Sequence, residues 1–322
     1  MRYSFFSFLF SIVLILGFSF PCQAANGKVK LPKYKVGSIG EDIMVIDASK
    51  KVDGFWVYLP QGKSKKADNV LVFMHGYGAF NPMIFGGWIK HLVADGNIVI
   101  YPRYQKSLTR PLPKKFVSHA LQGLKDAFLV LEDRGVDSDL WSSLDIVGHS
   151  YGGVISMNFA QNREAYELPP IKTIMICSAG TGPFKGGILS SYDKVSASLI
   201  IIDSQHDTTV GSKFSRYVNE LTEGKKNKVY LRQRSYKNKD IKITSHHNEP
   251  YAVDLAFDNG VRNFTSKKAL RVSRINILDT EGYWKLFDNL IEKRDSFRLF
   301  EGSDTAWQLS KENPDIKLLV LK

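Results

Sequence analysis

The sequence has 322 residues, of which 43% are hydrophobic and 24% are charged, and its formal net charge is +12. These proportions are ordinary for a folded protein with a sizeable core and exclude a disordered or fibrous chain. The positive charge favours anionic surfaces or acidic substrates. No basic recognition helix or stacking platform accompanies that charge, which argues against a nucleic-acid-binding module.

The N-terminal segment predicts export. A single basic residue, Arg2, precedes an uncharged apolar run over residues 5–20, and small residues follow. This order is typical of a signal peptide over residues 1–24, whose cleavage would leave the protein in the periplasm or outside the cell. An uncleaved N-terminal membrane anchor is the alternative, because the run is close to the lower length limit of a spanning helix.

The two cysteines are interpreted through the same segment. Cys22 lies inside the predicted signal peptide, and the residues 19–21 before it match a lipid attachment site poorly. Cleavage would leave Cys177 as the only cysteine, so the sequence predicts no internal disulfide despite export.

Strand-like segments follow in a regular order. Residues 43–48 and 54–60 flank a turn-like stretch and predict an N-terminal antiparallel hairpin. Beyond residue 69, apolar runs alternate with helical stretches, which is typical of a mostly parallel sheet covered on both faces. The later predicted strands are residues 69–74, 97–102, 144–148, 171–179, 198–204, 227–233 and 316–322.

Four helices are predicted between these strands and after them. They cover residues 81–96, 114–135, 153–163 and 282–294. In the second, Val117, Leu121 and Leu124 recur at three- and four-residue steps, which places them on one buried face. No repeat or long linker divides the chain, so residues 25–322 are predicted to form a single domain. The interval between residues 179 and 198 is too short for a large cap domain.

A serine motif follows the predicted strand at residues 144–148 and opens the next helix. It reads Gly148-x-Ser150-x-Gly152, within the stretch GHSYGG. A sharp turn from strand to helix brings backbones too close for side chains at the glycine positions, and it exposes the serine hydroxyl. In this context we interpret Ser150 as a nucleophile; the alternative is a plain glycine turn.

At these residues the chain resembles the α/β-hydrolase family, and the resemblance extends from about Asn69 to Leu290. It is carried by GHSYGG, by HGYG after the strand NVLVFM, and by an acid and a histidine that follow the serine in the family's chain order. The resemblance implies an α/β-hydrolase fold with a mostly parallel sheet of about eight strands. The short insertion resembles the lidless esterase, chlorophyllase and cutinase-like members. Haloalkane dehalogenases differ, because they carry aspartate where this chain has Ser150.

A serine needs a base and an orienting carboxylate, because its hydroxyl is otherwise a weak nucleophile. Asp207 is the expected acid, since it lies in a loop after the strand at residues 198–204, whereas the rival Asp203 lies on the strand itself. His246 and His247 both follow the acid in sequence. The resemblance favours His247 as the base and leaves His246 as the alternative.

Two backbone N–H groups are expected to stabilise the oxyanion, those of Tyr77 in HGYG and Tyr151 in the serine motif. The Tyr77 ring is either part of the acyl pocket or a half-exposed loop aromatic. A metal site formed by the histidine pair with Asp207 is disfavoured, because no helical His-x-x-x-His pattern or cysteine set accompanies them.

The sequence therefore predicts an exported serine hydrolase, a carboxylesterase that acts on a small-molecule or lipid-like ester and uses no cofactor or metal. Lipase, thioesterase, amidase or acyltransferase activity would use the same residues. A non-catalytic protein that binds the cell envelope is the alternative from another class, and peripheral association with an anionic envelope surface would fit the basic charge in either case.

Overall fold

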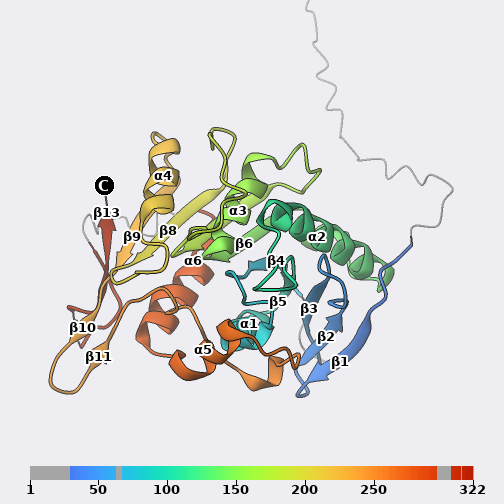
Figure 1. Ribbon diagram of the computed structural model, residues 1–322, viewed down its shortest axis with the longest axis horizontal. Coiled ribbons are helices and arrows are strands. Elements are labelled where there is room, and N and C mark those ends of the chain that lie inside the picture. The colour runs from blue at the N-terminus through green and yellow to red at the C-terminus, as the bar shows by residue number, and fades with distance from the viewer. Residues whose placement is uncertain (1–29, 63–66, 296–305, 313, 322) are drawn as a thin grey trace, which may run out of the picture. The chain divides into compact units, whose positions relative to one another are not determined.

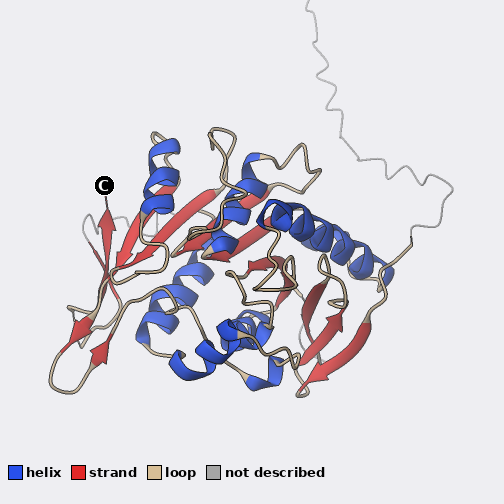
Figure 2. Ribbon diagram, in the orientation of Figure 1, coloured by secondary structure: helices blue, strands red, loops and turns tan. Residues whose placement is uncertain are grey.

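The computed structural model describes residues 30–62, 67–295, 306–312 and 314–321. The predicted signal peptide lies outside the described residues. From Leu31 onward, the described residues form one compact unit. Its described part has an α/β architecture, in which helices pack on both faces of a mixed sheet (Figures 1 and 2).

Six mutually parallel strands form the centre of the sheet. They are β4 (Asn69–Met74), β5 (Asn97–Pro102), β6 (Leu144–His149), β7 (Ile171–Cys177), β8 (Ser198–Ser204) and β9 (Lys228–Gln233). Each forms where an apolar run predicted it. Because the six strands share one direction, their carboxyl ends meet at one edge of the sheet, where functional side chains commonly gather.

Antiparallel strands extend both sides of this centre. They are β1 (Lys35–Ile39), β2 (Ile43–Asp47) and β3 (Phe55–Pro60) on one side, and β13 (Lys317–Leu321) and β12 (Ala306–Gln308) on the other. The full order is β1-β2-β3-β5-β4-β6-β7-β8-β9-β13-β12. The predicted hairpin is confirmed by the antiparallel pairing of β2 with β3.

The expected size of about eight strands was too small, because the main sheet has eleven strands within the described residues. The side chains of β1 are mostly exposed, so this strand has no apolar alternation that sequence could show. Strand β13 was expected from its composition, and it adds to the sheet by antiparallel pairing with β9. Among the eight strands from β2 to β9, β3 is the only one that runs opposite to the rest.

Alternate residues of the central strands face two separate cores. In β4, Leu71 and Phe73 join one core, whereas Val70 and Val72 join the other. The first core is covered by α1 (Gly86–Ala94), α5 (Phe264–Val272) and α6 (Lys285–Lys293), and the second by α2 (Phe116–Asp133), α3 (Tyr151–Gln161) and α4 (Lys213–Leu221). In Figure 1 the two sets of helices lie on opposite sides of the sheet.

All four predicted helices form, as α1, α2, α3 and α6, but they begin and end at other residues than predicted. A 3₁₀ turn over Pro82–Phe85 precedes α1, and a π-helical turn over Leu278–Trp284 precedes α6. Helices α4 and α5 were not predicted. The apolar face of α4 is narrow, with Phe214 and Val218 as its buried hydrophobic residues, and in α5 that role falls to Ala269 alone.

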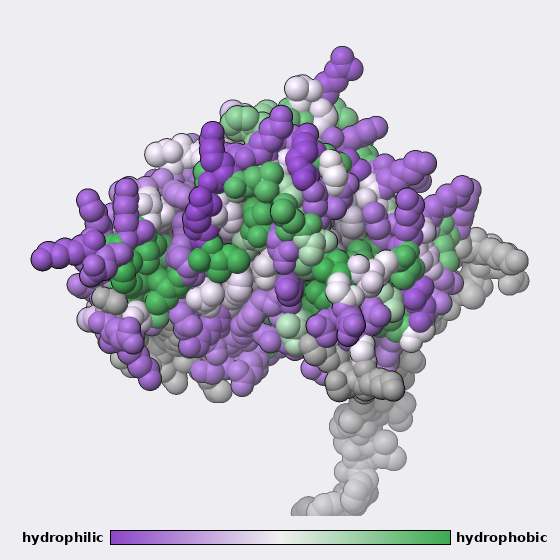
Figure 3. All heavy atoms as spheres, turned by 90° about the horizontal axis from the view of Figure 1, so that it is seen from below, coloured by the Kyte–Doolittle hydropathy of each residue, from purple (hydrophilic) through white to green (hydrophobic). Residues whose placement is uncertain are grey.

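The segments that follow β7 and β9 differ in content, and the segment after β9 also carries α5, whose Phe264, Thr265 and Lys268 line a cavity at this edge of the sheet. Residues 178–197, between β7 and β8, contain no helix or strand, and a small hairpin of β10 (Tyr236–Lys237) and β11 (Lys242–Ile243) follows β9. On the face shown in Figure 3, hydrophobic residues form separate groups within a mostly hydrophilic surface. Within the described residues, none of the helices has the length and apolar character needed to span a membrane.

Candidate active site

The turn at residues 148–152, called the serine turn below, joins β6 to α3. Ser150 has φ 55° and ψ −120°, a conformation that L-residues rarely adopt and that recurs at functional sites. A Cβ atom at Gly152 would lie 2.0 Å from the carbonyl oxygen of Met74, and one at Gly148 would lie 2.7 Å from Gly152. The turn therefore requires glycine at both positions because neighbouring backbone occupies the space.

Backbone hydrogen bonds fix this strained turn to the sheet. The N–H of Ser150 donates to the carbonyl of Cys177 at 2.9 Å, at the end of β7. The carbonyl of Ser150 accepts from the N–H groups of Gly153 and Gly180, at 3.0 and 3.1 Å. The serine is thus held between two strand ends, and its residue is only 5% exposed.

His247 and Asp207 form a buried hydrogen-bonded pair. His247 Nδ1 lies 2.8 Å from Asp207 Oδ2, and the two side chains are 8% and 2% exposed. Asp207 lies in the loop after β8, and His247 lies in a turn after β11. Because Nδ1 is engaged with the carboxylate, Nε2 is the ring nitrogen left to exchange a proton with another group.

The Asp207 carboxylate is held ionised by its neighbours. Its Oδ1 accepts from the N–H groups of Thr209 at 2.8 Å and Val210 at 3.0 Å. Burial by itself raises the pKa of Asp207, but the hydrogen bonds and charge of His247, together with the two N–H groups, lower it below its ordinary value. This carboxylate can therefore orient the imidazole and stabilise an imidazolium.

The rival residues take other partners. His246 Nδ1 accepts from the N–H of Asn248 at 3.1 Å, and its Nε2 lies 3.8 Å from Glu249 Oε2. Asp203 is buried on β8, where it bonds to Tyr230 and Arg232. Of the two histidines and two acids considered from sequence, the structure pairs His247 with Asp207.

The two residues expected to supply oxyanion donors are both near the serine in chain or cavity, because Tyr151 directly follows Ser150 and Tyr77 lines the same cavity as Ser150. The N–H groups of Tyr77 and Tyr151 donate to no acceptor within the described residues. Tyr151 is the first residue of α3, so its N–H points outward from the helix N-terminus. The Tyr77 ring stacks on Phe184 with centroids 4.3 Å apart, and its hydroxyl donates to Leu108, so the ring forms part of a pocket wall.

His149 holds the backbone of the proposed base, a role that sequence reasoning missed. Its Nε2 donates to the carbonyl of His247 at 2.8 Å. Burial lowers the pKa of His149 to about 3, so the ring is neutral and its Nδ1 carries a lone pair. Its place next to Ser150 was the available signal, but nothing in the sequence identified the partner 98 residues away.

Ser150 and His247 line one cavity of about 220 Å³, called the serine cavity below. Its walls also include Tyr77, Phe184 and Val210. The cavity therefore joins the serine turn, the histidine turn and the loop that follows β8. Such an arrangement can present a nucleophile, a base with an orienting carboxylate and two N–H donors to one bound carbonyl group.

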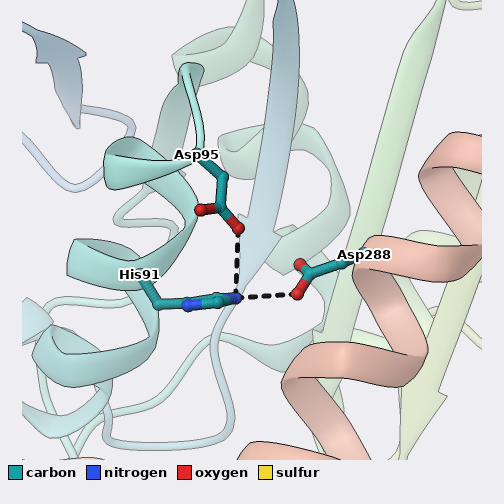
Figure 4. A group of neighbouring side chains, drawn as sticks. All are labelled: His91, Asp95 and Asp288. Carbon is teal, nitrogen blue, oxygen red and sulfur yellow. Dashed lines mark hydrogen bonds and ion pairs between the residues drawn. The ribbon is translucent and has the colours of Figure 1, made fainter.

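A second histidine–carboxylate cluster lies between α1 and α6 (Figure 4). His91 Nε2 is 2.8 Å from Asp288 Oδ2 and 3.4 Å from Asp95 Oδ2, and ligand atoms of all three residues lie within 4.8 Å of one another. Burial lowers the pKa of His91, but the hydrogen bond to Asp288 and the charges of both aspartates raise it overall. The three could hold a divalent cation, yet none of them lines the serine cavity.

Comparison with known proteins adds no relative. No protein-family model matches the chain, and no curated protein matches it significantly. The roles of these residues are therefore inferred from this chain's own sequence and geometry.

Proposed function

We propose that this protein is a serine hydrolase that cleaves carboxylic esters through an acyl-enzyme intermediate. The observation that carries the proposal is the buried Asp207–His247 pair beside a strained Ser150, with the histidine and the serine lining one cavity. A nucleophile, a base and an orienting carboxylate in this relation are the parts that acyl transfer requires.

The first half-reaction forms the acyl-enzyme. Ser150 Oγ attacks the ester carbonyl carbon, and its proton passes to Nε2 of His247 while Asp207 stabilises the imidazolium. The N–H groups of Tyr77 and Tyr151 stabilise the tetrahedral oxyanion. The intermediate collapses when the carbon–oxygen bond to the alcohol breaks, and the leaving alcohol takes the proton from Nε2.

The second half-reaction restores the serine. Water attacks the acyl carbon and gives a proton to Nε2 of His247, a second oxyanion forms at the same N–H groups, and the carboxylic acid leaves as Ser150 recovers the proton. This scheme requires no cofactor and no metal.

The sheet supports the finer proposal of an α/β-hydrolase fold. Seven of the eight strands from β2 to β9 share one direction, Ser150 follows β6, and the acid and the histidine come later in the chain. Residues 178–197 contain no helix or strand, which supports the lack of a large cap between β7 and β8, whereas Phe264, Thr265 and Lys268 of α5 form part of the wall of the serine cavity. The strand-turn-helix context around Ser150 is the one that a nucleophile elbow needs.

Export of the enzyme is part of the same proposal and rests on the sequence of residues 1–24. If the signal peptide is cleaved, the exported protein should begin at the residue after Ala24. N-terminal sequencing of protein collected from the periplasm or the medium of the expressing cells would check this. A chain that retains residues 1–24 in the membrane fraction would instead support the anchor.

A fluorophosphonate probe tests the hydrolase directly. We expect the wild type to be labelled and to hydrolyse p-nitrophenyl acetate or butyrate, and we expect Ser150→Ala to lose both properties. The control His246→Ala changes a residue next to the proposed base without removing the nucleophile or the base, and it should still be labelled. A folded wild-type protein that is neither labelled nor active would contradict the proposal and support a non-catalytic binding protein.

A further inference from the structure

A second cavity adjoins the serine cavity. It has a volume of about 630 Å³ and is called the lysine cavity below. The residues that line both cavities are Gly180, Thr181, Gly182, Thr209 and Val210. The two cavities therefore meet at the loop after β7 and the loop after β8.

The two volumes together leave room for a ligand larger than the serine cavity alone would hold. Small-molecule sites commonly measure about 300–1,000 Å³. The serine cavity, at about 220 Å³, falls below this range, whereas the lysine cavity, at about 630 Å³, lies well inside it. A substrate with its carbonyl at Ser150 thus has room to continue past Thr181 and Val210.

Lysines line both cavities, and no described acidic residue does. Lys185 and Lys213 line the lysine cavity, and Lys268 lines the serine cavity. No aspartate or glutamate is among the described residues that line either cavity. None of the three ammonium groups forms an ion pair with a carboxylate in the part of the chain that the structure describes.

The carboxylate of Asp207 does not neutralise these lysines. Asp207 belongs to the same loop as Thr209 and Val210, but both of its oxygens are bonded inward, to His247 and to the loop's own N–H groups. A cation-lined cleft without acidic walls raises the local concentration of anions. The lysines are therefore available to a ligand.

Apolar side chains complete the wall of the lysine cavity. Ile188, Phe214 and Tyr217 line it, and the Tyr217 hydroxyl is already engaged with the carbonyl of Leu189 at 3.1 Å. Apolar walls beside two ammonium groups fit a hydrocarbon segment that ends in an anion.

We propose that the lysine cavity binds the anionic end of an extended ester substrate whose carbonyl lies at Ser150, so that the protein prefers esters bearing a carboxylate or phosphate over neutral esters. This inference rests on the proposed hydrolase function. Lys185 and Lys213 determine the preference by attracting the anion, and Ile188, Phe214 and Tyr217 receive the chain that leads to it.

Matched ester pairs test the preference. The first pair is p-nitrophenyl octanoate and the mono-p-nitrophenyl ester of octanedioic acid, which differ by a terminal carboxylate on the acyl side. The second pair places the anion on the alcohol side, as the butyrate esters of 6-hydroxyhexanoic acid and of hexanol. The measured quantity is the ratio of kcat/KM for the anionic ester to that for its neutral partner, at low salt and at about 0.5 M salt.

The wild type should favour the anionic member of at least one pair by about threefold or more at low salt, and salt should reduce this ratio because the lysines are solvent-exposed. Reversing both charges, in Lys185→Glu/Lys213→Glu, should lower the ratio by about tenfold. The control Lys90→Glu/Lys226→Glu makes the same change in net charge at exposed positions outside both cavities, and it should keep the wild-type ratio.

Two outcomes would overturn the inference: ratios of one or less in both pairs, or a preference that survives in Lys185→Glu/Lys213→Glu. In either case, turnover of the neutral esters that is lost in Ser150→Ala would leave the hydrolase function standing. Failure of the function itself is recognised differently, as no turnover of any ester and no fluorophosphonate labelling.

Discussion

Two histidine–aspartate pairs in this molecule have the same length and different surroundings. His247 Nδ1 lies 2.8 Å from Asp207, and His91 Nε2 lies 2.8 Å from Asp288. The first pair lies in loops at the carboxyl edge of the sheet, with side chains 8% and 2% exposed, whereas the second joins two helices, with side chains 30% and 32% exposed. Distance alone therefore does not distinguish a candidate catalytic pair from a surface ion pair.

The ring nitrogen that each pair uses is the sharper difference. In His247 the carboxylate takes Nδ1 and leaves Nε2 as the second ring nitrogen, in a residue that lines the same cavity as Ser150. In His91 the carboxylates take Nε2, and the ring stacks on Trp284 with no serine in the cluster. A histidine can relay a proton only if its second nitrogen faces a reacting group, so function follows from what surrounds the pair.

Removing each imidazole in turn should show most clearly whether the two pairs differ in function. We expect His247→Ala to lower kcat for ester hydrolysis by at least about 10⁴-fold, because it removes the imidazole that is paired with Asp207 and that we propose takes the serine proton. His91→Ala should leave kcat within about twofold of the wild type. Steady-state kinetics on p-nitrophenyl butyrate would measure both, and equal losses in the two variants would show that the pairs are not distinct in function.

Removing the carboxylate charge should have a smaller but still large effect. Asp207→Asn should lower kcat by about 10³–10⁴-fold, because the amide cannot hold the same tautomer or stabilise the imidazolium. The matched change Asp288→Asn should alter stability and leave activity in place. The measurement is kcat together with the thermal unfolding midpoint; an Asp207→Asn enzyme that keeps full activity would rule out the orienting role.

Removing the hydrogen bond from His149 to the carbonyl of His247 should have an intermediate effect on activity. This bond holds the backbone of the proposed base, whereas no side chain within the described residues donates to the carbonyl of His91. We expect His149→Phe to lower kcat by about 10–100-fold through displacement of the base. His149→Gln, which retains an N–H donor, should recover part of the loss.

Labelling rates separate positioning from folding in this test. The rate of fluorophosphonate labelling should fall in His149→Phe at temperatures where the protein is fully folded, and it should rise again in His149→Gln. If labelling follows the unfolding midpoint alone, His149 serves the core and not the base.

The smallest expected effect is the pH-dependent stability from His91. The pKa of His91 is raised in the folded state above its value of about 6.5 in the unfolded chain. Its contribution to the free energy of unfolding is therefore fully present below about pH 6.5 and is lost as pH rises through the folded-state pKa. Because the pair is partly exposed, we expect wild type to exceed His91→Ala by about 1 kcal/mol at pH 6 and by less at pH 9. Urea unfolding at both pH values would measure this; a difference that grows with pH would contradict the assignment.

Sequence patterns succeeded where the burial pattern is strong. The six central strands and the β2–β3 hairpin were predictable because runs such as residues 198–204 are buried throughout. The prediction failed at β1, whose residues are mostly exposed, and at α5, which buries little. Those elements form because neighbouring elements pair with them or pack against them, and a local pattern does not record that contact.

For the candidate site, the sequence identified residue types better than their partners. The glycines around Ser150 were explicable in advance, since a turn this tight leaves no space for a Cβ atom, and the distances at Gly148 and Gly152 agree. By contrast, the choice between His246 and His247 depended on which side chain points toward Asp207. Adjacent residues in a turn project in different directions, and the backbone path there is fixed by packing.

The sequence by itself determined the central strands and the glycine-enclosed serine, because local periodicity and motif spacing record these features, and it reduced the candidate acids to Asp207 and Asp203 and the candidate bases to His247 and His246. Only the tertiary structure decided that Nδ1 of His247 meets Asp207, that His149 supports His247 from 98 residues away, and that the lysine cavity adjoins the serine cavity. These features arise from contacts between segments distant along the chain, and such contacts depend on how the strands and loops pack in three dimensions.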